Sequence, residues 1–211
     1  MSLKKYPTSK IKITSHHLFP SSLISLEVRE NTDELIEYSY DFLLTEALEC
    51  QSYMTTDNRI LKKFPRIEKI LLSYFNQIAK NIFLYPQDFA ISTSWVTQTE
   101  SFGCQWHTHK HCFYSGVYYF DSDYPEDSGK LQFKNPLIPY SDFRLIPQQY
   151  SIPTTDTWQE IPQKNKLVLF PSYLEHRVAE NKQKGRRSLA FNIVPTGEYG
   201  SGDSSYNTSW F

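Results

Sequence analysis

The sequence predicts a mainly β protein, a sandwich or barrel of short strands preceded by two helices. Tyr (15), Phe (14) and Trp (4) are abundant and Pro (12) is frequent, and this composition favours strands. Strand-like segments separated by turn residues recur at near-regular spacing between about Phe89 and Val194. We therefore expect one domain over residues 1–211, with the helices in 1–88, a β core in 89–195 and a polar tail in 196–211.

Helical spacing of apolar residues appears only in the N-terminal part. Residues 9–29 read as two extended pieces. A helix capped by Thr32 is then predicted up to about Cys50, followed by a polar stretch. Apolar residues from Ile67 to Ile82 predict a second, amphipathic helix.

The β core is predicted from alternation and from turn residues. The turn signals Asp127-Ser128-Gly129, Asn135-Pro136 and Lys184-Gly185 separate the segments. The tail is rich in Gly and Ser, so we expect it to be loosely held, with Trp210 and Phe211 docking against the body. The predicted strands are residues 89–100, 113–120, 129–135, 142–146, 157–161, 166–170 and 187–195.

Charge and composition exclude several classes of protein. The net charge of −1 gives no reason to expect nucleic-acid or membrane binding, and no apolar run approaches the ~18 residues of a membrane span. Phosphate-binding glycine loops and serine-hydrolase motifs are absent from the sequence. The three cysteines are too scattered for a disulfide framework, so we expect Cys104 and Cys112 to be small apolar fillers. With no secretory signal at the start, this predicts a cytoplasmic protein.

The histidines are the main functional signal. His107 and His109 stand two apart before a predicted strand, and side chains at i and i+2 of an extended chain point the same way. Two imidazoles aimed at one point suit a metal ion, although two surface histidines would give the same pattern. His111 has the same parity and is an alternative ligand. His176 follows the buried segment LVLFPSYLE and could supply a third ligand.

The last predicted strand has two distinct faces. Arg187, Leu189, Phe191 and Ile193 share one face, and three of these four are large and apolar. The other face is small and polar with one charge, which suits a cavity for a small anionic ligand bound by Arg186, unless this face meets water. Its residues are Arg186, Ser188, Ala190 and Asn192.

These segments together resemble the iron(II)/2-oxoglutarate oxygenases, and among them the small members found in bacteria and in phages of marine cyanobacteria. The resemblance is carried by HTHKHCFYSGVYYF, GKLQFKNP, KLVLFPSYLEHRVAEN and GRRSLAFNIVP, within roughly residues 89–195. The His-X-His pair alone is not specific, but its combination with SGVYY and with LVLFPS, the distal His and RxSxAFN is. The resemblance implies a double-stranded β-helix, a cupin-like jelly roll, with the helices packed outside.

The resemblance also implies a metal centre. His107, His109 and His176 would be the metal ligands and catalytic residues, with iron(II) as the metal. His109 stands where most members carry Asp or Glu, so the centre would have three neutral ligands instead of the usual two histidines and one carboxylate.

A co-substrate site and a reaction follow from the same resemblance. Arg186 and Ser188 match the residues that bind the distal carboxylate of 2-oxoglutarate, and Tyr118, with Tyr119 as its alternative, would line the same pocket. The implied reaction uses O2 to hydroxylate a C–H bond of a small molecule or a side chain while 2-oxoglutarate becomes succinate and CO2. The substrate itself is not indicated, and the loops 121–128 and 137–160 are expected to select it.

Two other functions stay open. A cupin-like three-histidine dioxygenase that does not use 2-oxoglutarate fits the His-X-His pair, although cupins place a Glu shortly after it, where this chain has Phe113 and Tyr114. A non-catalytic jelly roll, for binding or as part of a virion, is the third possibility. A homodimer is the default expectation for the oligomeric state.

Overall fold

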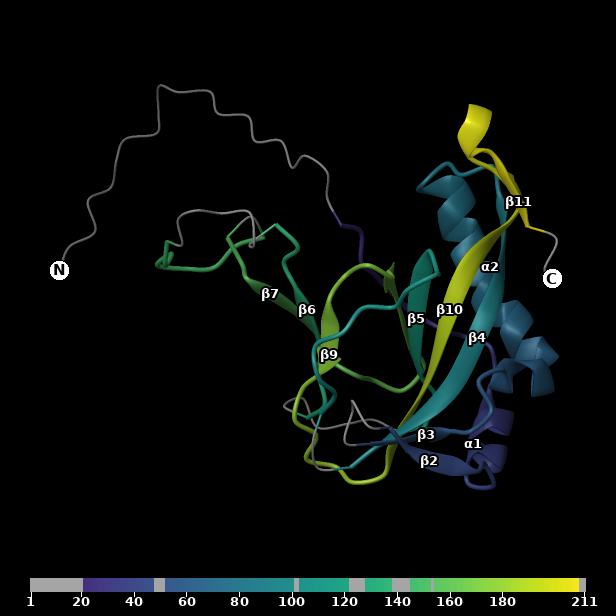
Figure 1. Cartoon of the computed structure of the whole chain (residues 1–211). Coiled ribbons are helices and arrows are strands. Elements are labelled where there is room, and N and C mark those ends of the chain that lie inside the picture. The colour runs from purple at the N-terminus through teal and green to yellow at the C-terminus, as the bar shows by residue number, and fades with distance from the viewer. Residues whose placement is uncertain are drawn as a thin grey trace.

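Two α-helices and a set of β-strands make up the computed structural model (Figure 1), which describes residues 21–47, 52–100, 103–121, 128–137, 145–152 and 154–208. The helices are α1 (Asp33–Ser39) and α2 (Pro65–Asn81), with short 3-10 helices η1 (Ile60–Lys63) and η3 (Gly202–Ser204). The strands are β1 (Ile24–Glu27), β2 (Leu44–Ala47), β3 (Ser52–Thr55), β4 (Asp88–Thr99), β5 (Tyr114–Tyr119), β6 (Leu131–Lys134), β7 (Thr157–Glu160), β8 (Lys166–Pro171), β9 (His176–Val178), β10 (Arg186–Tyr199) and β11 (Tyr206–Thr208).

The strands form two antiparallel sheets. The larger has the order β1-β8-β5-β10-β4-β3-β2, with β11 paired to the end of β10, and the smaller has the order β7-β6-β9. Figure 1 shows the helices on one side of the larger sheet and the smaller sheet on the other. This arrangement confirms the predicted jelly roll with helices on its outside.

The outer face of the larger sheet is sealed by α2. Apolar residues of this helix recur every three or four positions, so one stripe is buried: Ile67, Leu71, Phe75, Ile78 and Ala79. Pro65 begins the helix at a position where its missing N–H costs nothing. The ring of Phe75 packs at 5.0 Å from that of Phe89 on β4 and at 5.1 Å from that of Tyr114 on β5.

A second apolar cluster lies between the two sheets. Phe133 of β6 packs edge-on against Phe170 of β8, with ring centroids 4.9 Å apart. Leu131, Val168 and Tyr119 complete the buried centre of this layer. This cluster holds the two sheets together, and polar residues described below lie beside it.

The helix predicted from Thr32 is much shorter than expected. It ends at Ser39, and residues 44–47 form β2 instead, while Cys50 lies outside the described residues. The helical spacing of apolar residues after Ser39 is misleading because β2 pairs with β3 and satisfies its backbone hydrogen bonds there. The same pairing turns part of the predicted polar stretch into a strand.

Other predicted boundaries need correction. Leu145 and Ile146, from the strand predicted at 142–146, lie outside any strand and are almost fully exposed, and the rest of that segment falls outside the described residues. The tail is more ordered than expected, because β10 runs on to Tyr199 and pairs with β11, although Trp210 and Phe211 are outside the described residues. The three-part division of the chain stays a prediction.

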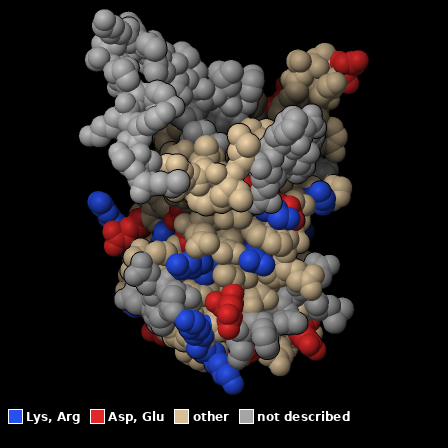
Figure 2. Space-filling model, turned by 90° about the vertical axis from the view of Figure 1, so that its left-hand side faces the viewer, with Lys and Arg blue, Asp and Glu red and all other residues tan. Residues whose placement is uncertain are grey.

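The surface carries both signs of charge. Figure 2, a view onto the side of the smaller sheet, shows Lys and Arg interspersed with Asp and Glu over the described part of that face. No helix within the described ranges is long and apolar enough to cross a membrane.

Candidate functional site

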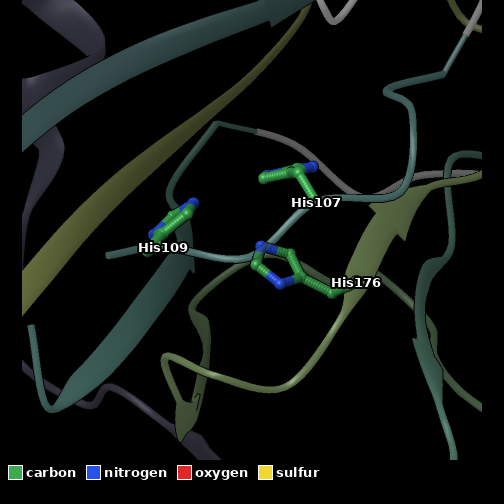
Figure 3. Close-up of side chains that lie close together, drawn as sticks. All are labelled: His107, His109 and His176. Carbon is green, nitrogen blue, oxygen red and sulfur yellow. The ribbon is translucent and has the colours of Figure 1, made fainter. Parts of the chain in front are cut away.

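Three histidines from two segments converge between the sheets. Figure 3 shows the rings of His107, His109 and His176 pointing toward one another. One potential ligand atom of each ring lies within 4.8 Å of those of the other two. The ring centroids of His107 and His176 are 4.3 Å apart, and those of His109 and His176 are 5.0 Å apart. A single ion could contact all three rings.

Main-chain hydrogen bonds position the backbone of the three histidines. His107 and His176 form an antiparallel bridge in which each N–H donates to the carbonyl of the other at 2.9 Å. The His109 N–H donates to the Ser172 carbonyl at 3.0 Å, so the extended His-X-His segment is bound along the chain that leads into β9. Because the segment is extended, both of its imidazoles face the same side, as the spacing predicts.

Each ring has an acceptor at Nδ1. Nδ1 of His107 lies 2.8 Å from the Gln105 carbonyl, and Nδ1 of His176 lies 2.9 Å from the Leu174 carbonyl. Nδ1 of His109 lies 2.7 Å from Oδ1 of Asn192. These acceptors assign the proton to Nδ1 in every ring and leave the Nε2 lone pairs for a ligand.

Burial keeps two of the rings uncharged. It lowers the pKa of His176 to about 3, and the neighbouring His107 and His109 add to this effect against the opposing hydrogen bond to Leu174. Burial also lowers the pKa of His109, although its bond to Asn192 acts in the opposite direction. A neutral imidazole is the form that binds a metal, so these two rings are in the binding form at neutral pH.

Arg186 and Ser188 lie on the same face of β10 as Asn192. Arg186 is 1% exposed and Ser188 is 6% exposed, so this face does not simply meet water. Nη1 of Arg186 donates to the Gly129 carbonyl at 2.9 Å, and the guanidinium carbon lies 5.5 Å from the centre of the Tyr119 ring. Gly129 has a φ of +58°, and a Cβ there would come within 3.1 Å of the guanidinium. A glycine is therefore needed for this close approach.

The two tyrosines expected for the co-substrate pocket lie on opposite faces of β5. Tyr118 pairs with Leu189 and faces the helices, where its hydroxyl lies 2.6 Å from Oγ1 of Thr32. Tyr119, the alternative, faces Arg186. Successive residues of a strand face opposite sides, so only one of the two can lie on the side of the histidines.

Arg187 has a different environment from Arg186. Its Nε and Nη2 donate to Oε1 of Gln98, and its Nη1 donates to Oγ of Ser39. Its guanidinium carbon lies 4.1 Å from the centre of the Tyr40 ring. Arg187 thus ties β10 to β4 and to α1 on the helix side of the sheet.

Two other sequence expectations have clear outcomes. His111 does not join the cluster, because its φ of +59° turns the chain away after His109 and leaves the residue exposed. Cys104 is disulfide-bonded, contrary to the expectation of a small apolar filler, whereas Cys112 is free. The sulfur of Cys104 lies 3.6 Å from Nδ1 of His107.

Sequence reasoning placed Asn192 on the polar face of β10 but assigned it no role. It also missed a row of residues across the smaller sheet, in which His107, His176, Phe133 and Trp158 are successive partners. Paired residues share a face, so Trp158, 49% exposed, lies on the same face as the histidines at the far edge of the row. The short β9, which carries His176, gave no alternation long enough to predict this row.

Comparisons with known proteins agree with this geometry. A family model described as "Putative 2OG-Fe(II) oxygenase" matches residues 93–192, which include the three histidines, Arg186 and Asn192. No curated protein matches the sequence.

Solved structures share the fold. A 2OG-Fe(II) oxygenase family oxidoreductase from Burkholderia pseudomallei superposes with a TM-score of 0.58 at 11% identity, covering 82% of this chain and 84% of that one. HygX from Streptomyces hygroscopicus, with nickel and 2-oxoglutarate bound, gives 0.56 at 11% identity and covers 83% and 84%. A Pseudomonas putida prolyl-4-hydroxylase gives 0.55 at 15% identity and covers 82% and 92%. Residues 93–192 therefore match the 2OG-Fe(II) oxygenase family model, and the chain shares its fold with solved oxygenases of that kind.

Proposed function

We propose that this protein is an iron(II)- and 2-oxoglutarate-dependent oxygenase that hydroxylates a C–H bond of its substrate. His107, His109 and His176 would hold the metal through Nε2, and Arg186 and Ser188 would bind the distal carboxylate of 2-oxoglutarate. The observation that carries the proposal is the convergence of three imidazoles whose Nδ1 atoms all have acceptors. Three further expectations stay predictions: that the protein is a homodimer, that its substrate is a small molecule or a side chain, and that it resembles phage proteins.

The donor set fits a divalent transition metal. Three imidazole nitrogens suit iron and its neighbours in the first row, and among the residues the structure describes these three form the group of potential ligands. The acceptors at Nδ1 orient the rings and make Nε2 a better donor. Burial lowers the pKa of His109 and lowers that of His176 to about 3, so at neutral pH protons compete little with a metal for these two rings.

The chain's own residues divide the remaining work. When bound, iron would supply the activation of O2 that couples decarboxylation of 2-oxoglutarate to oxidation of the substrate. The Arg186 guanidinium can pair with a carboxylate through two parallel N–H bonds, and the Ser188 hydroxyl can donate a third. Phe133 and Phe170 flank His176, with ring centroids 6.1 and 4.6 Å from it, and shield that side of the site from water. Overall, C–H, O2 and 2-oxoglutarate give C–OH, succinate and CO2.

An anaerobic titration tests the proposal. Metal-free protein receives iron(II) and then 2-oxoglutarate, while the visible charge-transfer absorption of the iron chelate is followed. We expect the band to appear in the wild type, to vanish in H176A and to require about 10- to 100-fold more 2-oxoglutarate in R186A, because a charged bidentate contact is lost. R187A is the matched control, since its guanidinium lies on the opposite face of β10.

Three outcomes separate the possible functions. Iron binding without the band would contradict the use of 2-oxoglutarate and favour a three-histidine dioxygenase of the cupin type, which the absence of a carboxylate at position 109 makes the second candidate. An unchanged 2-oxoglutarate requirement in R186A would contradict the assignment of the arginine. Failure to bind any metal would leave a jelly roll without catalysis.

A further inference from the structure

Asn192 contacts one of the three clustered histidines, His109. Its Oδ1 lies 2.7 Å from Nδ1 of His109, and its Nδ2 donates to Oγ1 of Thr93 on β4 at 2.9 Å. A carboxamide oxygen can only accept, so the hydrogen on this contact belongs to the imidazole. His109 must then carry its proton on Nδ1, with the Nε2 lone pair turned to the other two rings.

Two serines extend this contact into a small network. Oγ of Ser115 donates to Oδ1 of Asn192 at 2.9 Å and lies 3.0 Å from Nδ1 of His109. Oγ of Ser172 lies 2.9 Å from Oγ of Ser115. Strands β4, β5 and β10 and the turn after β8 therefore hold the Asn192–His109 pair through uncharged groups.

The three histidines differ in what orients them. Main-chain carbonyls accept from His107 and His176, at Gln105 and Leu174, and no side-chain substitution removes a carbonyl. His109 alone of the three relies on a side chain for its Nδ1 acceptor. One substitution at position 192 can therefore disturb one ring of the cluster and leave the other two in place.

We propose that Asn192 is the positioning residue of the metal centre, which holds His109 in its Nδ1-protonated form and directs Nε2 to the ion. The part of this inference that concerns the ion rests on the proposed function, and the part that concerns the protonated nitrogen does not. Asn192 performs this task without charge, so neither the third ligand nor its partner brings a negative charge to the centre.

Two measurements test the inference: one identifies the protonated ring nitrogen of His109, and the other gives the affinity for a metal ion. Long-range 1H–15N correlation spectra of metal-free protein at pH 7.5 report which ring nitrogen carries the proton, with H109Q identifying the signals of His109. Cobalt(II) titration, followed by its visible absorption, reports metal affinity. In wild type we expect a single Nδ1-protonated His109, and in N192A a mixture of tautomers with cobalt affinity reduced about 10- to 100-fold.

Two variants control for a merely structural role. N192D keeps an acceptor at the same place, so we expect the Nδ1-protonated signal to return and cobalt affinity to be at least that of the wild type. N181A removes another buried asparagine, whose Nδ2 donates to the carbonyls of Thr99 and Glu100. We expect N181A to lower the melting temperature without moving the His109 signal or the cobalt affinity.

The outcomes are distinct. The inference is overturned if N192A keeps both the Nδ1-protonated signal and a cobalt affinity within twofold of wild type. It is also overturned if N181A lowers cobalt affinity as much as N192A does. If wild type fails to bind cobalt or iron, the proposed function fails, and the spectra of the metal-free protein still decide whether Asn192 fixes the proton.

Discussion

The two faces of β10 meet opposite environments although they share one strand. Leu189, Phe191 and Ile193 are fully buried against the helix side. The other face points into the space between the sheets and carries Arg186, Ser188 and Asn192. There, Asn192 contacts His109 of the candidate metal centre. Because successive side chains of a strand point to opposite faces, β10 can stabilise the core with one set of residues and build the candidate site with the other.

The largest effect is expected on the helix side. Phe191→Ala removes a buried ring that packs across Gly116, where even one Cβ atom would lie 2.3 Å from the ring. The lost burial and the remaining cavity should lower the free energy of unfolding by about 3–5 kcal/mol. Chemical denaturation measures this change. Cobalt affinity of the folded fraction should be unchanged, and a parallel loss of affinity would show that the two faces are coupled.

The reverse pattern is expected from His176→Ala. This variant removes one of three ligands, so metal affinity should fall at least 100-fold, or about 2.7 kcal/mol. Calorimetric titration with cobalt(II) or zinc(II) measures the affinity, and the far-ultraviolet circular dichroism spectrum should stay that of the wild type. Retained affinity would exclude His176 as a ligand.

Acid should lower the free energy of unfolding of the metal-free protein, because His176 is buried in its neutral form. The unfolded chain protonates His176 near pH 6.5, whereas burial holds the folded pKa at about 3. Between these values the unfolded state binds more protons, so stability falls as the pH drops through this window, by about 1–2 kcal/mol from pH 7.5 to 5. Denaturation of metal-free protein across this range measures the slope, and H176Q should flatten it. Equal slopes would contradict the assignment to His176.

The smallest expected effect distinguishes two neighbouring tyrosines. Tyr118→Phe loses a buried hydrogen bond to Thr32 and should cost about 1 kcal/mol of stability while leaving the binding of 2-oxoglutarate unchanged. Tyr119→Phe should instead weaken the binding of 2-oxoglutarate a few-fold, because it removes the hydroxyl that interacts with the Arg186 guanidinium. Melting temperature and the charge-transfer titration measure the two quantities. If Tyr118→Phe weakened the binding of 2-oxoglutarate and Tyr119→Phe did not, the two faces of β5 would be the reverse of those described here.

Elements with a strong periodicity were predicted correctly. The apolar stripe of α2 and the long strands β4, β5, β8 and β10 were predicted because each buries a continuous face. Elements that depend on a distant partner were missed, as β2 is specified by β3 and not by its own pattern. The same reason explains the overlong first helix.

The site was partly predictable for similar reasons. The spacing of His107 and His109 and the parity of Arg186 and Ser188 could be read along the chain. The acceptors at Gln105 and Leu174 could not, because they are main-chain carbonyls that any residue offers. Choosing between Tyr118 and Tyr119 needed the register of β5 against β10, which local pattern does not give.

Trp95 lies close enough to the histidines to act as a built-in optical reporter. Its ring centroid is 5.6 Å from that of His109, on the strand that carries Thr93. Emission from an indole this near a cobalt or iron ion is quenched, so loading of the centre would dim the intrinsic fluorescence of unlabelled protein. Trp95→Phe would remove that part of the signal and identify its source among the four tryptophans of the chain.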